Sequence, residues 1–388
     1  MSRSFNREVE KIAVSDIRQF DSDVSGIPGI IKLTLGEPDF NTPEHVKKAA
    51  IKAIEDNKSH YTPNAGFMEL REETAKYFNK KYNLNYSGTQ VVTTVGATEA
   101  INASLQAILN PDDTVLVPTP IFPLYLPISN LNHGNYILMD TSGEDNFVLT
   151  ADKLRKVIAD NKDKNIKCLV LNYPSNPTGV TYNREQLEEL AEVIKENDIW
   201  VLSDEIYAEL TYTGKHVSLA EIIPDNVILI SGLSKSHAMT GWRIGFILGP
   251  QDFIDQVVKS HQYMVTAPTT NAQYAALEAV TNGYDDAVPM KEEYLKRRDF
   301  IIEELQEVGF EIASPDGAFY IFAKIPANCP QNSWDFVRDL AKEAKVALIP
   351  GVSFGPGGEG YVRMSYAASM ENLVEAVKRI KDYVQSRK

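Results

Sequence analysis

Between about residues 90 and 260 the chain alternates short apolar runs with longer segments whose apolar positions recur every three or four residues. The short runs are typical of buried strands and the longer segments of helices that pack on a core. The predicted strands are 91–94, 114–117, 136–139, 168–171, 200–203, 227–230 and 244–248. The predicted helices among them are 99–109, 151–160, 184–196 and 251–259. This alternation predicts a mainly parallel sheet. The last two strands lack a helix-length spacer, so one of them is antiparallel or is reached by a long loop.

Outside this region the pattern is dominated by helices. Helical spacing occurs at 43–56 and 68–82 and, less regularly, at 8–23, where the glycines and proline of 26–29 end it. After residue 285 the predicted helices are 291–308, 334–345 and 370–386, and the predicted extended segments are 318–325 and 361–365. We therefore expect a large domain over 44–284 and a smaller α/β domain formed by 1–43 and 285–388.

The net charge of the chain is −14, from 53 acidic and 39 basic residues. Such a surface repels phosphate backbones and anionic lipids, which argues against nucleic-acid and membrane-surface functions. The N-terminus has no apolar signal core, and four prolines interrupt the apolar stretch 115–128, so we expect a soluble cytoplasmic protein. Cys168 and Cys329 are predicted to be structural thiols, and the six histidines show no spacing typical of a metal site.

Ligands of α/β sheets bind at the carboxyl ends of the strands, and four predicted strand ends carry unusual residues. The first is followed by Gly96-Ala97-Thr98, where small residues allow an anion to approach the N–H groups of a helix start. An ordinary helix start with a capping threonine would explain the same residues. The second strand end is followed by Asn176 before a proline, a pairing that is also common in plain loops.

The third strand end carries Asp204, with Tyr207 close behind it. A carboxylate there is costly to desolvate unless it meets a cation, although a helix N-cap is the alternative. The fourth strand end is followed by Ser234, Lys235 and Arg243. A lysine between small hydroxyl residues is atypical of a solvated surface, and an arginine is well suited to bind a phosphate. Together these ends predict a site for pyridoxal 5′-phosphate (PLP), which has a phosphate, a pyridinium nitrogen and an amine-reactive aldehyde.

In their order and spacing, these motifs resemble those of the class I aminotransferases of the aspartate aminotransferase family, PLP enzymes of fold type I. The resemblance rests on Gly36-Glu-Pro-Asp39, Tyr61-Thr-Pro-Asn-Ala-Gly66, Gly96-Ala-Thr98, 118–125, Asn176-Pro-Thr-Gly179, Asp204-Glu-Ile-Tyr207, the segment from Ser234 to Arg243, and Arg363. It covers nearly the whole chain. It implies an α/β fold with a mainly parallel seven-stranded sheet flanked by helices, plus a smaller α/β domain.

The resemblance also implies roles for individual residues. Lys235 is expected to form the internal aldimine with PLP and to move the substrate proton, with a pKa lowered by burial and by neighbouring positive charge. Asp204 is expected to pair with the pyridinium nitrogen, and Asn176 and Tyr207 to bond the phenolic oxygen. Phe122 is expected to stack on the ring, with a plain core role as the alternative. The residues implied around the phosphate are Gly96, Ala97, Thr98, Ser234 and Arg243.

Further residues bear on substrate binding and assembly. Gly232 stands where the family often has a serine, which implies that one phosphate hydroxyl is missing here. Tyr61 resembles the tyrosine that reaches the phosphate of the neighbouring subunit, which implies a homodimer with composite sites. Arg363 resembles the arginine that binds the substrate α-carboxylate, with a surface arginine as the alternative. Gly36 lies where the family closes its N-terminal segment over that carboxylate.

The reaction that these residues favour is transamination between an L-amino acid and a 2-oxo acid. The apolar loop 121–126 and the lack of a recognisable second cation favour an aromatic or broad-range donor, with 2-oxoglutarate as acceptor. The nearest-looking branch contains aromatic and N-acetyl-diaminopimelate aminotransferases. An N-acetyl-diaminopimelate or aspartate aminotransferase is therefore an alternative, and a cystathionine-type β-lyase on the same fold is the alternative of another class.

Overall fold

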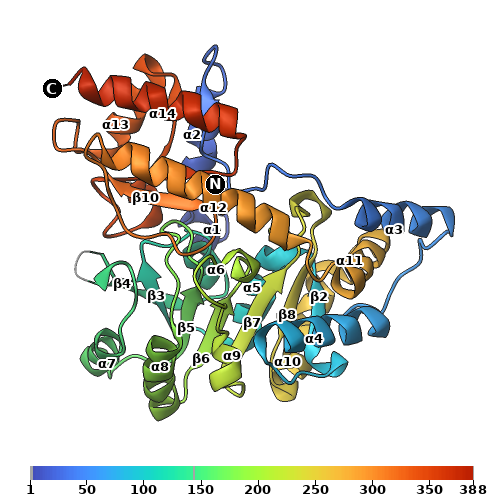
Figure 1. The fold of residues 1–388 in the computed structure, drawn as a ribbon. Helices are drawn as coiled ribbons and strands as arrows, with labels where there is room; N and C mark the ends of the chain where they lie inside the picture. The colour runs from blue at the N-terminus through green and yellow to red at the C-terminus, as the bar shows by residue number, and fades with distance from the viewer. Residues whose placement is uncertain (1–2, 143–144, 388) are drawn as a thin grey trace.

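A seven-stranded sheet lies at the centre of the computed structural model, which describes residues 3–142 and 145–387 (Figure 1). Its strand order is β2-β8-β7-β6-β5-β3-β4, and only β8 runs antiparallel to its neighbours, between β2 and β7. The strands are β2 (Val91–Thr94), β3 (Thr114–Thr119), β4 (Asn135–Asp140), β5 (Ile166–Asn172), β6 (Trp200–Asp204), β7 (Val227–Gly232) and β8 (Gly245–Leu248). The predicted α/β class with a mainly parallel seven-stranded sheet is confirmed.

Helices cover both faces of this sheet because its central strands are apolar on both sides. In β5, for example, Leu169 and Leu171 enter the core on one face, and Cys168 and Val170 enter the core on the other. The helices are α3 (Glu44–Glu55), α4 (Met68–Tyr82), α5 (Gly96–Ile108), α6 (Tyr125–Leu131), α7 (Ala151–Asp160), α8 (Arg184–Asn197), α9 (Leu219–Ile222), α10 (Gln251–Val265) and α11 (Thr270–Asn282).

Three of these helices, α6, α9 and α11, have no counterpart among the predicted elements, and α11 is the longest of them. Its buried positions are mostly alanines, namely Ala272, Ala275, Ala276 and Ala279. Alanine contributes little to an apolar periodicity, although its small side chain lets α11 pack closely on α3 and α4. Helix α5 also starts earlier than predicted, at Gly96, so the small residues of the first motif form its first turn.

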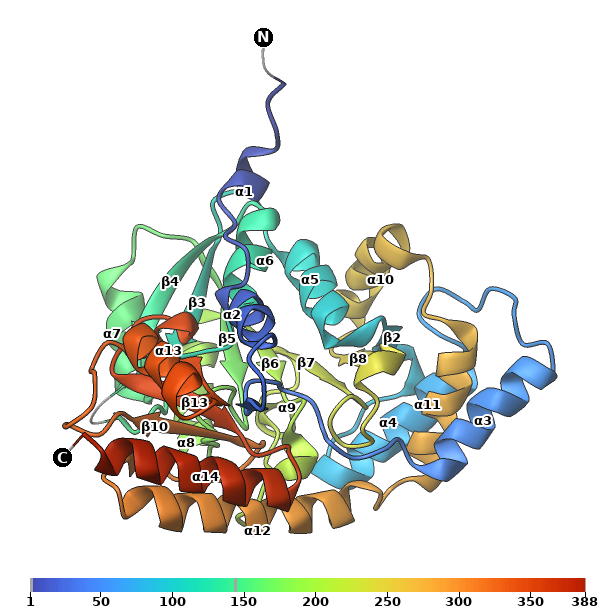
Figure 2. The ribbon, with the colours of Figure 1, turned by 90° about the horizontal axis from the view of Figure 1, so that it is seen from above.

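A second, smaller body packs above the carboxyl ends of the large sheet (Figures 1 and 2). It contains a four-stranded sheet in the order β12-β13-β10-β9 and the parallel pair β1-β11. Its strands are β1 (Ile31–Lys32), β9 (Glu311–Ile312), β10 (Tyr320–Lys324), β11 (Val346–Ala347), β12 (Ile349–Pro350) and β13 (Tyr361–Ser365), and its helices are α2 (Asp16–Val24), α12 (Ala287–Gln306), α13 (Ser333–Glu343) and α14 (Met370–Gln385). A separate apolar core holds them together.

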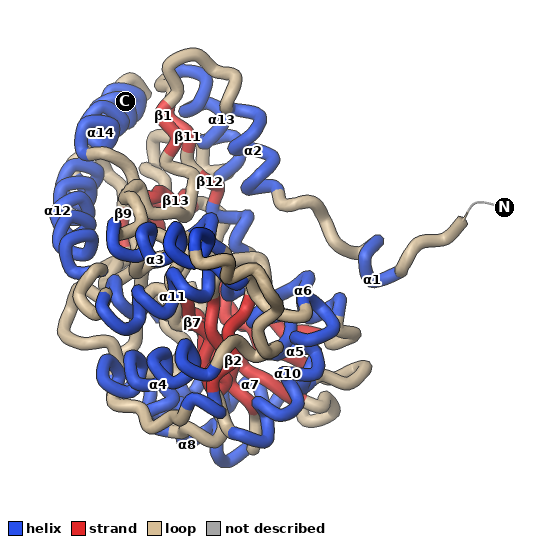
Figure 3. The backbone as a smooth tube through the Cα atoms, turned by 90° about the vertical axis from the view of Figure 1, so that its right-hand side faces the viewer, coloured by secondary structure: helices blue, strands red, loops and turns tan. Residues whose placement is uncertain are grey.

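The N-terminal segment divides into two parts. Residues 3–14 project from the small body, and their short helix α1 (Arg7–Glu10) lies beside α6, whereas α2 packs on the small body (Figure 3). Because β1 pairs with β11, we propose that 1–43 and 285–388 form one domain and 44–284 the other. No helix within the described part of the chain is long and apolar enough to cross a membrane.

Candidate active site

Three parallel strands of the large sheet direct polar residues toward the small body at their carboxyl ends. Asp204 is the last residue of β6, Asn176 follows β5 by four residues, and Lys235 follows β7 by three. The N–H of Asn176 donates to the side chain of Asn172 at 2.9 Å, which fixes the turn after β5. Because β5, β6 and β7 are adjacent in the sheet, the predicted strand-end residues lie along one edge of it.

Asp204 is buried, with both of its carboxylate oxygens bonded. One oxygen accepts from the Tyr125 hydroxyl at 2.7 Å and the other accepts from the Ile206 N–H at 3.2 Å. Burial raises the pKa of Asp204 to about 6, and the bond from Tyr125 opposes that rise. At neutral pH the carboxylate is therefore ionised, although its surroundings make that charge unfavourable until a cation approaches.

The Lys235 amine lies among aromatic rings and backbone. It donates to the carbonyl oxygen of Gly36 and lies 5.6 Å from the ring centre of Tyr207 and 5.7 Å from that of Phe319. Burial lowers the pKa of Lys235 to about 8, and the Arg243 guanidinium acts in the same direction. The unprotonated fraction of this amine near neutral pH is thus minor but far larger than that of an ordinary lysine, which favours its use as a nucleophile or a general base.

The start of α5 and Arg243 form a cradle for an anion. Gly96 has a φ of +77°, which favours glycine, and a Cβ there would lie 2.4 Å from the Arg243 guanidinium and would displace it. The Val95 N–H at the start of α5 donates to the Glu99 carboxylate at 3.1 Å, whereas the N–H groups of Gly96, Ala97 and Thr98 have no side-chain acceptor among the described residues and can face a ligand. Two hydroxyls lie nearby, that of the exposed Thr98 and that of the buried Ser234. Neither makes a hydrogen bond with any described residue.

Gly232, which stands where the family often has a serine, is sterically constrained. A Cβ at this position would lie 2.8 Å from the Ile244 carbonyl oxygen and 3.0 Å from the Gly245 Cα. Both are backbone atoms, at the start of the antiparallel strand β8. A serine would therefore force the strands apart.

Arg363 is a buried cation that has no acidic partner among the residues the structure describes. Its guanidinium donates to the side-chain oxygen of Asn176 at 3.0 Å and to the Thr34 carbonyl, and its Nε has no partner among the described residues. The ring of Tyr320 lies 4.7 Å from it and that of Phe354 5.0 Å. Burial lowers the pKa of Arg363. Because a buried charge is stable only when it is paired, this arrangement favours an anion that arrives from outside.

Arg297, in contrast to Arg363, is a buried arginine with acidic partners. Arg297 is the only other buried arginine in the described ranges, and no lysine there is buried. It pairs with Asp39 through bonds of 2.8 and 2.9 Å, and with Glu293 at 3.1 Å. The pair also attaches the Gly36–Asp39 motif to α12, so this segment is fixed to the small body.

Two tyrosines whose hydroxyls bond to predicted site residues were not themselves predicted as site residues. Tyr125 bonds to Asp204, and Tyr320 shares a hydrogen bond of 2.8 Å with the Tyr207 hydroxyl. Tyr125 lies three positions after Phe122, in the apolar stretch 121–126 that was predicted to line the pocket for the substrate side chain. Nothing in the neighbouring sequence indicated that its hydroxyl would bond to Asp204. Tyr320 lies inside an extended run, and only the packing of the two bodies places it beside Tyr207.

Two predicted residues, Tyr61 and Phe122, form no hydrogen bond with the other predicted residues among the described residues. Tyr61 has 90% of its side chain exposed and stays outside the site within one chain. Phe122 is half-buried in the loop between β3 and α6 and packs against the core on the α5 face of the sheet.

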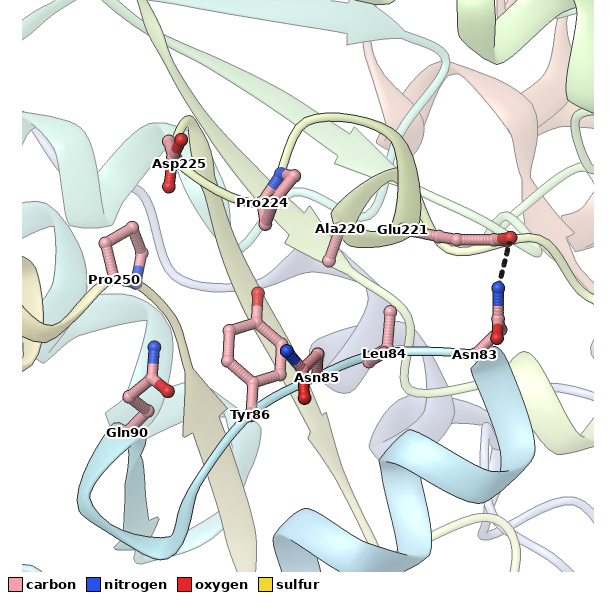
Figure 4. A pocket seen from close by; sticks show the side chains of 10 residues that line it. All are labelled: Asn83, Leu84, Asn85, Tyr86, Gln90, Ala220, Glu221, Pro224, Asp225 and Pro250. Carbon is pink, nitrogen blue, oxygen red and sulfur yellow. Dashed lines mark hydrogen bonds between the residues drawn. The ribbon is translucent and has the colours of Figure 1, made fainter.

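A pocket elsewhere on the surface is a poor candidate. It has a volume of about 280 Å³ and lies near the start of β2, and none of the predicted site residues lines it (Figure 4). Its lining contains no lysine, arginine or histidine, so it offers no cation for a phosphate or a carboxylate. It is lined by Asn83, Leu84, Asn85, Tyr86, Gln90, Ala220, Glu221, Pro224, Asp225 and Pro250. Metal-binding clusters of acidic, cysteine and histidine side chains are likewise absent from the described ranges.

The residues at the strand ends fit PLP. The α5 cradle with Arg243 suits a phosphate, Asp204 suits a protonated ring nitrogen, and the Lys235 amine suits an aldehyde. The unpaired Arg363 then remains for a second anion, such as the carboxylate of an amino acid. This set of groups can hold a carbonyl cofactor and a carboxylate substrate beside one amine that is able to accept a proton.

Comparisons with known proteins show which family the chain is similar to. Residues 28–380 match the family model for aminotransferase class I and II. The chain is 46% identical over 385 residues to a probable N-acetyl-LL-diaminopimelate aminotransferase of Bacillus subtilis, covering 99% of this chain and 96% of the relative. It is 38% identical to aromatic-amino-acid aminotransferase 2 of Thermococcus litoralis, covering 98% of each. A solved double mutant of Thermus thermophilus aspartate aminotransferase superposes with a TM-score of 0.93 at 36% identity, covering 98% of this chain and 100% of that one.

Proposed function

The chain belongs to the class I and II aminotransferases, which use PLP, and we propose that it transfers the amino group of an aromatic or broad range of L-amino acids to 2-oxoglutarate. Its relatives carry the names of aromatic, aspartate and N-acetyl-diaminopimelate aminotransferases, so family membership leaves the donor open. The choice of donor depends on the surroundings of Arg363.

The observation that supports an aromatic donor is an apolar wall beside Arg363. The Ile121 N–H donates to the Phe354 carbonyl at 2.9 Å, which joins the loop 121–126 to the residue whose ring packs on the Arg363 guanidinium. A donor held by its carboxylate at Arg363 would extend its side chain near this loop. A side-chain carboxylate would need a second cation, and Arg363 is the only buried arginine of the described ranges that lacks an acidic partner.

A second candidate substrate comes from the comparison with known proteins. The Bacillus subtilis relative, at 46% identity, is named as a probable N-acetyl-LL-diaminopimelate aminotransferase. This substrate also presents an amino acid group to Arg363, but its distal end is larger and polar. It therefore serves as the main competitor in the test.

The test is a half-reaction with the PLP-loaded enzyme and no oxo acid. Phenylalanine, aspartate and N-acetyl-LL-diaminopimelate are added singly, and the loss of the cofactor's visible band is followed in time. We expect phenylalanine to react with the highest rate constant per molar concentration. A clear preference for either other donor would overturn the aromatic assignment. Persistence of the band while a sulfur amino acid releases pyruvate and ammonia would identify a β-lyase instead.

The proposed roles follow from the contacts of each residue. Gly96, Ala97, Thr98, Ser234 and Arg243 would hold the phosphate, Asp204 the ring nitrogen, and Asn176 and Tyr207 the phenolic oxygen. PLP, when bound, supplies the electron sink that stabilises negative charge at the substrate Cα. Lys235 would accept and return the Cα proton, and Arg363 would orient the substrate through its carboxylate. Phe122 would cover the ring and exclude water.

Replacing Asp204 by asparagine should raise the stability of the cofactor-free protein but weaken its binding of the cofactor. Burial raises the pKa of Asp204 from 3.8 to about 6, so in the cofactor-free protein its destabilising effect is absent below about pH 4, grows up to about pH 6 and is constant above that. Asp204→Asn should therefore raise the melting temperature of the cofactor-free protein relative to wild type by more at pH 8 than at pH 4. The same variant should bind PLP roughly 10- to 100-fold more weakly, because it loses a charge-assisted bond. Equal affinity in the two proteins would contradict the role of Asp204.

We further propose that the enzyme is a homodimer in which Tyr61 completes the site of the partner. Tyr61 is 90% exposed, and the projecting N-terminal segment exposes 78% of Phe5 and 83% of Val14. Large apolar side chains on a projecting segment are typical of contacts with another chain. A twofold arrangement would use each of these surfaces twice, because both subunits present the same residues.

A further inference from the structure

The hydroxyls of Tyr207 and Tyr320 form a hydrogen bond that joins the two bodies of the protein. Tyr207 follows β6 of the seven-stranded sheet, and Tyr320 begins β10 of the four-stranded sheet. The oxygens are 2.8 Å apart, and both side chains are buried. Tyr320 faces the same side of its sheet as Arg363, because Phe322, two residues further along β10, is directly paired with Arg363.

The two hydroxyls carry two protons but share a single hydrogen bond. Neither hydroxyl has any other partner among the described residues. One buried proton is therefore left without an acceptor, which is unfavourable unless a ligand supplies one. The direction of the shared bond decides whether the free proton belongs to Tyr207 or to Tyr320.

The surroundings of Tyr320 favour it as the donor of the shared bond. Its ring packs on the Arg363 guanidinium, which has donors and no acceptor. Burial raises the pKa of Tyr320, and the positive charge of Arg363 offsets part of that rise, which makes the hydroxyl a better donor. The Tyr320 oxygen also lies against Gly36, where a Cβ would be only 2.3 Å away from it. Tyr207, by contrast, lies beside Asp204 and Lys235, where the cofactor ring would bind.

We propose that Tyr320 is a positioning residue whose hydroxyl donates to Tyr207 and thereby directs the Tyr207 proton to the phenolic oxygen of the bound cofactor. This inference rests on the proposed PLP function. A hydroxyl that accepts a hydrogen bond becomes a stronger donor, so Tyr320 strengthens the bond from Tyr207. Because Gly36 has no Cβ, the Tyr320 hydroxyl can lie against the segment that is anchored by Asp39 and Arg297.

The test is a pH titration of the visible band in the PLP-loaded Tyr320→Phe enzyme. A bond to the phenolic oxygen favours the form in which that oxygen is negatively charged, so weakening it should raise the midpoint of the spectral change. A cooperative strengthening of about 10–30% for a charge-assisted bond corresponds to a rise of roughly 0.2–0.6 pH units. The matched control is Tyr366→Phe, which removes an equally buried hydroxyl that contacts Tyr212 and Ala318 instead.

A rise in Tyr320→Phe that is absent in Tyr366→Phe supports the proposal. An unchanged or lowered midpoint, or an equal rise in both variants, overturns it. Gly36→Ala provides a second route if Tyr320→Phe does not fold, because its added methyl would displace the Tyr320 hydroxyl and should raise the midpoint similarly. In the double variant the two effects should not add, and full additivity would also overturn the proposal. A wild-type enzyme that forms no visible band with PLP would contradict the proposed function itself, which is a separate result.

Discussion

Lys235→Ala is expected to lower kcat by at least about 10⁴-fold while the protein remains folded, because the variant loses both its covalent partner for PLP and its proton acceptor. The side chain is half-buried and makes one hydrogen bond, to the Gly36 carbonyl, so its removal should cost little stability. Steady-state rates, the visible spectrum after PLP addition and a thermal melt measure the three quantities. Within the described ranges, Lys235 is the lysine whose charge acts on the Asp204 carboxylate, so no other described lysine is placed to replace it.

Lys235→Arg is the matched control, because it keeps the positive charge and most of the side-chain volume. A guanidinium remains protonated at all working pH values and cannot act as the base, so this variant should be as inactive as the alanine variant. Added small primary amines should restore part of the Lys235→Ala activity, and the restored rate should increase with pH as the free-base fraction of the amine grows. Turnover within about tenfold of wild type in Lys235→Ala would contradict the assignment of this lysine.

The sequence was sufficient to predict the large sheet and the residues at its strand ends. Each of these predictions depends on local pattern: an apolar run marks the strand, and the residues immediately after it must lie at the sheet edge. Asn176, Asp204 and Lys235 were identified in this way, and the structure places all three at the carboxyl ends of adjacent strands. The antiparallel strand was predicted only as one of two alternatives, because the short connection between β7 and β8 does not itself reveal the pairing order.

The contacts that cross between the two bodies could not be predicted from local pattern. Arg363 and Asn176 are 187 positions apart, and Tyr207 and Tyr320 are 113 apart. Their meeting depends on the register of β10 with β13 and on the packing of the small sheet over the large one. The resemblance to a family pointed to Arg363 but gave no indication of Tyr320. A phenol in an extended apolar run looks like any other core residue until its neighbours are known.

Tyr125 is a second tyrosine whose role could not be predicted from the local pattern. The loop 121–126 reads as apolar, and that reading is correct for Ile121, which is buried beside Phe354. Tyr125 belongs to the same run, yet its hydroxyl donates to Asp204 and stabilises the ionised carboxylate. One short loop thus contributes to both the substrate pocket and the electrostatics of the cofactor site, because its residues point in different directions.

Arg363→Ala is expected to reduce kcat/KM for amino acid donors by roughly 10²- to 10⁴-fold, mainly through a higher KM. The guanidinium is buried and lacks an acidic partner among the described residues, so a substrate carboxylate would gain a desolvated, charge-assisted pair worth about 3–5 kcal/mol when broken. Removing this unpaired cation should not lower the melting temperature of the substrate-free enzyme by much. Arg363→Lys keeps the charge but loses the planar, two-point contact, so we expect it to recover only part of the lost affinity.

The decisive measurement for Arg363 compares phenylalanine with phenethylamine, which has the same side chain and amine but no carboxylate. Wild type should prefer phenylalanine by a factor close to the loss caused by Arg363→Ala, since the same ion pair accounts for both differences. In Arg363→Ala that preference should shrink toward unity. If the variant instead loses activity equally toward both compounds, Arg363 maintains the shape of the site and does not bind the carboxylate. The position of the aromatic wall at Ile121 and Phe354 would then no longer indicate which donor the enzyme prefers.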